Sequence, residues 1–199
     1  MACKERVAVK HAFLVGDNIY LRGLCLEDLE GEYVAWFNDA EVCQYNSHHV
    51  FPYNKQMAES YIKNVATTRT ALILAIVLKS TDKHIGNISL QNIDPISRSA
   101  EFAIIVGDKN EWGKGYSKEA AFLIAKHGFA SLNLHRIYCG TSAQNGAMQK
   151  LALYLGMQQE GRRREALYKN NVYEDIIEYG LLSKEFFEKF ASEYGDKNV

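Results

Sequence analysis

Three apolar, strand-like segments in the middle of the chain follow one another with only short turns between them. The segment ALILAIVLK (71–79), the turn at 80–83 and the segment HIGNISLQN (84–92) are typical of a β-hairpin, and residues 100–106 predict a further strand. Only the segments after Val106 and after Thr141 have the pattern of strand-to-helix crossovers. Doubly wound nucleotide-binding folds alternate strand and helix throughout, so the sequence argues against that class.

The rest of the chain supplies the other elements of a mixed α+β domain. On the first predicted helix, Trp36 and Phe37 share a face with Leu29 and Tyr33, which assigns all four to the core. With 199 residues, of which 47% are hydrophobic and 24% charged, the chain fits a single domain over 1–199. Further strands are predicted at 18–26, at 136–141 and on both sides of a turn at 169–171, and helices at about 28–38, 57–65, 116–132, 145–155 and from about 183.

Charge and cysteine content exclude several classes of protein. The formal net charge of −1 gives no overall field that would draw the protein onto nucleic acid or an anionic membrane. The four cysteines, Cys3, Cys25, Cys43 and Cys139, have neither CxxC nor zinc-type spacing. Basic residues interrupt the apolar N-terminus, and no apolar run reaches transmembrane length. We therefore expect a cytoplasmic protein with reduced thiols and without a metal, a nucleic-acid partner or a membrane partner.

The stretch EFAIIVGDKNEWGKGYSKEAAFLIAKHGF (101–129) places Gly113 and Gly115 between a strand and a helix. Unpaired N–H groups at a helix N-terminus favour an anion such as a pyrophosphate, and glycines keep side chains out of its way. The spacing fits neither a Walker loop, which needs Ser or Thr after Gly-Lys, nor a dinucleotide fingerprint, which needs a third glycine at position 118. The two glycines also suit a strand-to-helix turn without a ligand.

This stretch resembles motif A of the GNAT superfamily of acetyl-CoA-dependent N-acetyltransferases, especially the branch similar to ribosomal-protein N-terminal acetyltransferases (RimJ/RimL-like). A second superfamily motif follows in the expected order as QNGAMQKLALYLGMQQEG (144–161). The resemblance extends over about 18–182, the core of the domain, with a C-terminal helix after it. It implies the GNAT fold, a mixed, mostly antiparallel and partly splayed sheet of about seven strands with helices on both faces. It also implies acetyl-CoA as co-substrate, and it is compatible with a homodimer.

Carried over residue by residue, the resemblance implies a site for coenzyme A. The main chain of Ile104, Ile105 and Val106 would pair with the pantetheine arm, and Asn145 would hydrogen-bond it, although Asn is also a good N-cap. Asn110 stands where relatives usually have Gln or Arg, so one phosphate contact is expected to be weaker. The turn that would hold the pyrophosphate consists of Asn110, Glu111, Trp112, Gly113, Lys114, Gly115, Tyr116 and Ser117.

Acetyl transfer needs a base for the acceptor amine and a hydrogen-bond donor for the tetrahedral oxyanion. The resemblance suggests Glu101 as the base, directly or through water, but an exposed strand carboxylate explains it equally well. His48 and His49 are alternative bases because imidazole titrates near neutrality, although each also fits an ordinary loop histidine. The oxyanion donor would be a main-chain N–H of Ile105 or Val106, where relatives have a bulge that splays the strands.

The departing thiolate has no obvious proton donor in the sequence. Ala152 occupies the position at which many relatives have a tyrosine, and Tyr154 lies about 200° around the helix from it. Ser142, Tyr168 and Tyr173 are further candidates that the sequence does not rank.

The acceptor is expected to bind the loop between the first two helices. Its candidate residues are Tyr45, His48, His49, Phe51 and Tyr53, enough aromatic and hydrogen-bonding groups to wall a small pocket. The loop lacks the acidic cluster that a polycation would require. We therefore expect a small primary amine, with an amino sugar, free or nucleotide-linked, as the leading acceptor and a protein N-terminus as the alternative. A third reading, motivated by Asn110 and Ala152, is a non-catalytic domain that binds acyl-CoA as a sensor or scaffold.

Overall fold

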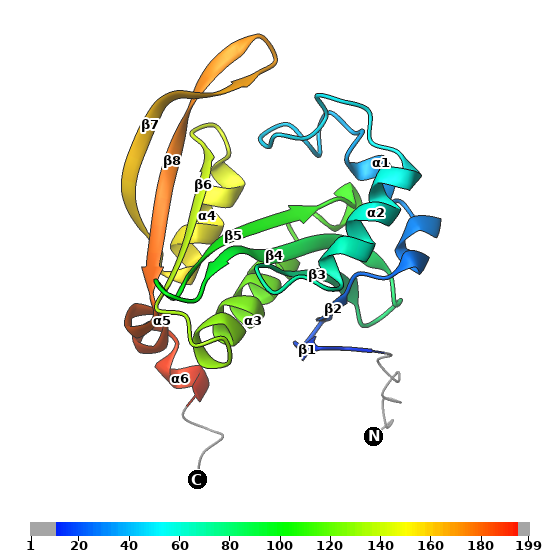
Figure 1. Cartoon of the computed structure of the whole chain (residues 1–199). Coiled ribbons are helices and arrows are strands. Elements are labelled where there is room, and N and C mark those ends of the chain that lie inside the picture. The colour runs from blue at the N-terminus through cyan, green and yellow to red at the C-terminus, as the bar shows by residue number, and fades with distance from the viewer. Residues whose placement is uncertain (1–10, 195–199) are drawn as a thin grey trace.

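The computed structural model describes residues 11–194, which form one eight-stranded sheet with helices on both faces (Figure 1). The strand order is β1-β2-β3-β4-β5-β6-β8-β7. The pair β5–β6 is parallel, and the other neighbouring pairs are antiparallel. The strands are β1 (Leu14–Val15), β2 (Ile19–Gly23), β3 (Leu72–Leu78), β4 (His84–Asp94), β5 (Ser99–Val106), β6 (Arg136–Ser142), β7 (Gln158–Lys169) and β8 (Val172–Leu182).

The helical elements cover the two faces separately. The helices α3, α4 and α5 share one hydrophobic cluster with alternate residues of the strands, including Leu74, Ile76 and Leu78 of β3. The elements η1, α1 and α2 enclose a second cluster on the opposite face, built around Tyr33 and Trp36. The helical elements are η1 (Leu26–Glu30), α1 (Tyr33–Trp36), α2 (Lys55–Val65), η2 (Lys109–Glu111), α3 (Tyr116–Ala130), α4 (Gly146–Leu155), α5 (Ser183–Lys189) and α6 (Ala191–Tyr194).

The fold class expected from the sequence is confirmed, with two differences. The sheet has eight strands rather than about seven, because β1 is only two residues long and too short to show an alternating pattern. The first predicted helix is interrupted: the 3₁₀ turn η1 and the single turn α1 are separated at Gly31, which is extended. The expected core face is nevertheless confirmed, since Leu29, Tyr33, Trp36 and Phe37 are all buried.

The sheet is splayed in its middle. Strands β5 and β6 pair only over Ser99–Glu101 and Arg136–Tyr138. Beyond Glu101, β5 pairs with β4 alone, up to Val106, and β6 pairs with β8 alone. The edge of β5 from Phe102 to Val106 that faces β6 therefore has no strand partner within residues 11–194, and we call it the open edge of β5. The splay predicted from the resemblance is confirmed.

The β4–β5 ladder is regular at Ile105 and Val106 themselves, and the two-against-one pattern of a bulge lies just beyond them, where Gly107 and Asp108 both donate to the Ile85 carbonyl at 2.9 and 3.1 Å. The register is continuous from the pair Gly86–Val106 to the pair Gln91–Glu101, and it shifts only between Gln91 and Asp94. Asn92 lies in this shift with a positive φ of 50°. The two strands part because β6 diverges after a short parallel contact. Strand β4 is irregular near both ends of the open edge, at Ile85 beside Val106 and between Gln91 and Asp94 beside Glu101.

The hairpin formed by β7 and β8 extends beyond the rest of the sheet, and its tip arches toward the loop between α1 and α2 (Figure 1). Within the described range, no helix is both long and apolar enough to cross a membrane. Cys25, Cys43 and Cys139 are free thiols there, and Cys3 lies outside the described residues.

Candidate active site

The turn before α3 is a cradle of main-chain donors. Gly113 and Gly115 have φ values of 76° and 90°, in the left-handed region that side-chain-bearing residues rarely adopt. A Cβ at either position would meet no atom within 4 Å, so the space above the turn is open. From Gly113 to Ser117, the main-chain N–H groups have no hydrogen-bond acceptor within the part of the chain described. Such a row of free amides at a helix N-terminus is suited to a phosphate.

The lysines of this turn are already paired with carboxylates. Lys114 contacts Glu111 at 2.9 Å, and Lys109 contacts Asp39 at 2.8 Å and Glu41 at 3.0 Å. An anion in the cradle would therefore interact mainly with main-chain amides.

The side chains of Asn110 and Trp112 are also directed away from the cradle. The Asn110 amide donates to the Asp108 carboxylate at 3.2 Å, and the Trp112 indole donates to the Val106 carbonyl at 2.8 Å.

Helix α3 is anchored at the end that carries the cradle. The carboxylate of Glu119, in the first turn of the helix, accepts from the main-chain N–H of Asn18 at 2.9 Å and of Ile19 at 3.3 Å. A Cβ on Gly16 would overlap that carboxylate, so a side chain there would displace Glu119 from its contacts with Asn18 and Ile19. Glu119 therefore fixes the direction of α3 against β2 and holds the row of amides in place.

Glu101 lies where the strands part. It is the last β5 residue paired with β6, opposite Tyr138, and Asn92 donates to one of its carboxylate oxygens at 2.9 Å. Successive strand residues alternate between faces, so Glu101, Ala103 and Ile105 lie on the face that η1, α1 and α2 cover. Burial, with a contribution from the nearby Glu101 carboxylate, raises the pKa of Tyr138. Glu101 is thus a half-buried carboxylate at the inner end of the open edge.

Strand β4 contributes a column of polar side chains that we did not predict. Asn87, Ser89 and Gln91 stand opposite Ile105, Ala103 and Glu101, on the same face of the sheet. Asn87 and Ser89 are buried, and the Gln91 amide donates to the Ser89 hydroxyl at 2.8 Å. The available signal was the alternation N-x-S-x-Q, with Ile88 and Leu90 directed to the main core between these polar residues.

A second unpredicted feature lies beneath α1 and α2. The Tyr33 hydroxyl is fully buried without a hydrogen-bond partner in residues 11–194, and it lies close to Asn87 and the Tyr53 phenol. Burial raises the pKa of Tyr33, and the neighbouring phenols of Tyr53 and Tyr61 contribute to the shift. A buried hydroxyl without a well-formed hydrogen bond costs free energy, so the Tyr33 phenol is a polar group that packing holds in place at some expense of stability.

A charged network supports this polar region from below. The His84 Nε2 atom lies 2.9 Å from both the Gly86 carbonyl and the Asn87 side-chain oxygen, and its Nδ1 atom lies 3.1 Å from Asp28. The guanidinium of Arg22 donates to both oxygens of Asp28, at 2.5 and 2.9 Å. The network fixes η1 and α1 against the strand that carries the polar column.

The predicted acceptor residues are distributed along a loop without helix or strand, at 38–54. The amide of Asn38 closes the base of this loop by exchanging two hydrogen bonds with the main chain of Tyr53, at 2.7 and 2.9 Å. His48 packs edge-on against Phe37 with ring centroids 4.7 Å apart, and Tyr53 packs against the same ring at 4.9 Å. The loop thus brings His48 and Tyr53 together around Phe37. Tyr45 is half-buried, whereas His49 and Phe51 are exposed.

His48 keeps contact with solvent although its ring packs on Phe37. Its partial desolvation, together with the ammonium of Lys169, lowers the pKa of His48 and favours the neutral imidazole at pH 7. The residue can therefore accept a proton, but it sits on the loop rather than on the sheet that forms the open edge.

The remaining candidate residues lie at or near α4 and on the β7–β8 hairpin. The Asn145 side chain caps α4 by accepting from the Met148 N–H at 3.1 Å, which confirms its structural reading. Ser142 is buried and donates to the Glu174 carboxylate. Ala152 is fully buried.

The tyrosines considered as proton donors lie elsewhere. Tyr154 lies under the ammonium of Lys118, a residue at the start of α3, and the Lys118 Nζ atom is 5.3 Å from the centroid of the Tyr154 ring. Tyr168 and Tyr173 form an exposed pair at the hairpin tip, with ring centroids 4.8 Å apart.

Known proteins share both the sequence pattern and the fold. The acetyltransferase (GNAT) domain family matches residues 18–158. The uncharacterized N-acetyltransferase p20 of Bacillus licheniformis is 30% identical over 175 residues, which cover 87% of this chain and 97% of that protein. The spermidine N(1)-acetyltransferase of Vibrio cholerae is 30% identical over 105 residues, 53% of this chain and 60% of that protein.

A solved structure agrees with this assignment at the level of the fold. A crystal structure of spermidine N-acetyltransferase from Vibrio cholerae in complex with CoA and spermine has a TM-score of 0.79 with this chain. The sequence identity is 24%, and the likeness covers 86% of this chain and 99% of that one. The chain therefore belongs to the acetyltransferase (GNAT) domain family, and it is an N-acetyltransferase.

Proposed function

We propose that the protein transfers an acetyl group from acetyl-CoA to the primary amine of a small molecule, with an amino sugar, free or nucleotide-linked, as the leading class of acceptor. The observation that carries this proposal is that a row of free amides, an unpaired strand edge and a carboxylate follow one another along the chain. The free amides from Gly113 to Ser117 lie directly after the open edge of β5, and Glu101 lies at the other end of that edge. A molecule with a diphosphate, an extended arm and a reactive end fits this succession.

Coenzyme A would bind through its diphosphate to the turn and through its pantetheine arm to the main chain of Ile104, Ile105 and Val106. The chain has the required donors, because the N–H row is unpartnered and nothing occupies the space at Gly113 and Gly115. The CoA complex of the similarly folded Vibrio cholerae protein supports the same use of the fold here. Asn145 would use its amide nitrogen toward the arm while its oxygen caps α4.

The chemistry at the open edge would proceed by direct attack of the amine on the thioester carbonyl. Glu101 would take the amine proton, directly or through water, and Asn92 would hold its carboxylate in position. A main-chain N–H of Ile105 or Val106 would stabilise the oxyanion. The carbon–sulfur bond then breaks, which leaves the N-acetyl product and the thiolate of CoA. Ala152 cannot protonate this thiolate, and Tyr154 is placed beside Lys118, so we assign that step to no side chain.

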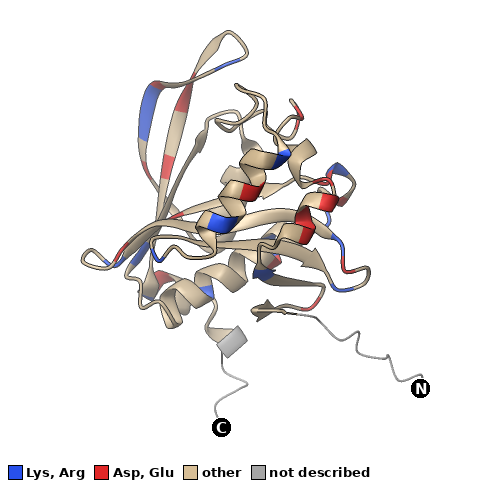
Figure 2. Ribbon diagram, turned by 45° about the vertical axis from the view of Figure 1, so that its right-hand side comes forward, with Lys and Arg blue, Asp and Glu red and all other residues tan. Residues whose placement is uncertain are grey.

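The acceptor side favours a compact, hydroxylated amine. The face of the sheet that carries Glu101, Ala103 and Ile105 also carries the neutral β4 column of Asn87, Ser89 and Gln91, with the Tyr33 phenol close to Asn87 and Tyr53. On the hairpin, basic positions of β7 pair with acidic positions of β8, as in the ion pairs Arg162–Asp175 and Arg163–Glu178 (Figure 2). Neither sign of charge dominates this wall, and a polyamine would find few free carboxylates.

A protein N-terminus is the second candidate acceptor. The observation in its favour is the resemblance of 101–129 to the ribosomal-protein N-terminal acetyltransferase branch. We further propose a cytoplasmic location and a homodimer. Sedimentation of the purified protein would test the homodimer. A domain that only senses acyl-CoA is the alternative from another class, since Asn110 turns away from the cradle.

Two measurements on the purified protein test the proposal. Titration calorimetry with CoA should show binding, and absence of binding by folded protein would refute the donor side. Release of free thiol from acetyl-CoA should depend on an added amine, with glucosamine and its nucleotide conjugates ahead of spermidine and of short peptides. Bound CoA without acceptor-dependent release across that panel would favour the sensor instead. Faster release with peptides would favour protein N-termini.

A further inference from the structure

Lys169, the last residue of β7, is a buried lysine whose partners are main-chain carbonyls. It is 8% exposed, and its ammonium donates to the carbonyl of Asn46 at 3.1 Å and to that of His48. None of the ion pairs formed within residues 11–194 involves this lysine. Burying an ammonium is costly unless its donors are satisfied, so the two carbonyls hold the hairpin and the loop together. We call this contact the Lys169 clasp.

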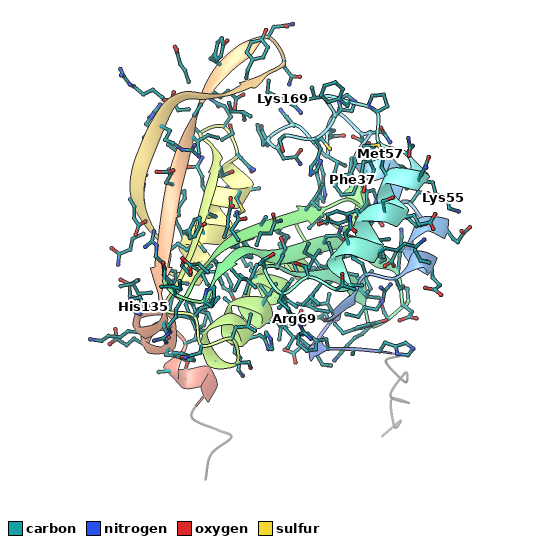
Figure 3. The ribbon with its side chains drawn as sticks, viewed as in Figure 1. Phe37, Lys55, Met57, Arg69, His135 and Lys169 are labelled. Carbon is teal, nitrogen blue, oxygen red and sulfur yellow. The ribbon has the colours of Figure 1, made fainter. Side chains whose placement is uncertain are left out.

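The clasp joins the two segments that flank the open edge of β5. On one side, the loop 38–54 is attached to the cluster that includes Phe37 and, in part, Ile105 of β5 itself. On the other side, β8 is the neighbour of β6, the strand that diverges from β5. Figure 3 shows Lys169 at the hairpin tip, reaching the loop above Phe37. The contact therefore spans the splay at the end away from the core of the sheet.

Apart from the clasp, the loop tip (44–50) makes mainly local contacts among the described residues, and Cys43 just before it is fully buried and donates through its thiol to the Trp36 carbonyl at 3.3 Å. The base of the loop is closed by Asn38 and Tyr53, and its beginning is tied by Lys109 to Asp39 and Glu41. Around His48, the contacts are the packing on Phe37, a local hydrogen bond from the His48 N–H to the Asn46 side chain, and the clasp. Removing the Lys169 ammonium would thus free the tip without affecting the base.

We infer that Lys169 determines acceptor specificity by closing the acceptor side of the site, so that compact amines enter and chain-like acceptors are excluded. This inference rests on the proposed function, because it concerns the acceptor of the same site. A long acceptor, such as a peptide whose N-terminus lies at Glu101, would have to pass between the hairpin and the loop where the clasp joins them. A compact amine ends before that point.

The experiment compares Lys169→Met with a matched control, Lys189→Met. Lys189 also donates to a main-chain carbonyl, that of Leu153 at 3.1 Å, but it joins α5 to α4 outside this site. Binding is measured by calorimetry with two conjugates in which the CoA sulfur is linked through an acetyl spacer to glucosamine or to the N-terminus of a short flexible peptide. Hydrogen exchange of peptides covering 44–50 and 166–173 is measured in parallel.

In the wild type, the peptide conjugate should bind more weakly than the glucosamine conjugate. Lys169→Met should reduce the affinity ratio between the two conjugates by on the order of tenfold, and amide hydrogen exchange should accelerate in both segments. Lys189→Met should change neither quantity. An unchanged affinity ratio would overturn the inference even if exchange accelerates, since the clasp would then be structural only. Unchanged exchange would overturn the clasp itself, whatever the conjugates do. If neither conjugate nor CoA bound, the proposed function would fail, and hydrogen exchange would still decide whether the clasp exists.

Discussion

Two loops flank the open edge of β5, and they are held in different ways. The turn before α3 owes its shape to residues within it, since Gly113 and Gly115 have positive φ and Asp108 accepts from the Asn110 N–H two residues on. The loop 38–54 instead owes its position to distant residues, because Lys109 is 70 residues from Asp39 and Lys169 is 121 residues from His48. The conformation of the donor turn is thus locally encoded, although Glu119 anchors α3 to Asn18 and Ile19, 101 and 100 residues away in the sequence. The acceptor loop, by contrast, takes its position mainly from long-range contacts. A substitution that impairs one side should therefore leave the other side largely intact.

The largest effect is expected in the Arg22–Asp28–His84 network, which supports the acceptor side. Asp28 is buried between Arg22 and His84, so Asp28→Ala leaves the half-buried Arg22 guanidinium without its carboxylate partner. We expect the free energy of unfolding to fall by about 3–5 kcal/mol, measured by urea denaturation. The control is Asp175→Ala, which removes the ion pair with the exposed Arg162 and should cost about 1 kcal/mol or less. Equal losses in the two variants would contradict this account of the network.

The same carboxyl should make stability depend on pH. Burial alone would raise the pKa of Asp28, but the hydrogen bonds from Arg22 and His84 outweigh it and hold that pKa well below its usual range. A carboxyl with a lowered folded pKa contributes stability that is present above its unfolded pKa of about 3.9 and is lost as pH falls toward the folded value. Below about pH 4, the wild type should therefore lose stability more steeply than Asp28→Asn. Parallel pH profiles would show that Asp28 is not the group responsible.

The next effect concerns the point where the two sides meet. Glu101→Gln removes the proposed base but keeps the shape of the side chain, so kcat/KM at pH 7 should fall by roughly 10²- to 10³-fold. The loss should shrink at high pH, where more of the amine is already unprotonated. The matched variant is Glu178→Gln, which alters a strand carboxylate on the same face of the sheet that is paired with Arg163. If Glu101→Gln retains full activity at pH 7, the base lies elsewhere, and His48→Gln is the variant to examine next.

On the donor side, Gly115→Val tests the amide cradle. Valine is strained at a φ of 90°, and its side chain would occupy the space open to the diphosphate. We expect CoA to bind roughly 30- to 100-fold more weakly by calorimetry, about 2–3 kcal/mol. Gly23→Val is the control, because that glycine also has open space around it but lacks a positive φ. Wild-type affinity in a folded Gly115→Val protein would exclude the cradle as the CoA site.

The sequence allowed the donor side to be predicted and left the acceptor side largely open. The strand ending at Val106, the glycine turn and α3 follow one another directly, so a local pattern was enough to locate them. The polar column of β4 could have been found from its alternation, but only with the knowledge that a helical layer covers that face. The clasp could not have been found, because nothing near Lys169 or His48 in the sequence indicates that they meet. The interruption of the first helix, by contrast, had a local signal in Gly31, which is extended and donates its N–H to the Asp28 carbonyl at the end of η1.

The smallest effect is expected for Tyr33→Phe. This variant tests whether the Tyr33 hydroxyl affects only the stability of the fold or also the binding of the acceptor. The Tyr33 hydroxyl is buried and unpartnered in the described structure, so its removal should leave the free energy of unfolding unchanged or raise it by about 1 kcal/mol. If a hydroxyl of the acceptor completes this group together with Asn87, KM for the acceptor should rise a few-fold while CoA affinity stays constant, since the cradle is formed by other residues. Steady-state kinetics at saturating acetyl-CoA would measure the change. An unaltered KM together with increased stability would instead mean that a buried water completes Tyr33, and that the acceptor is recognised nearer to Glu101.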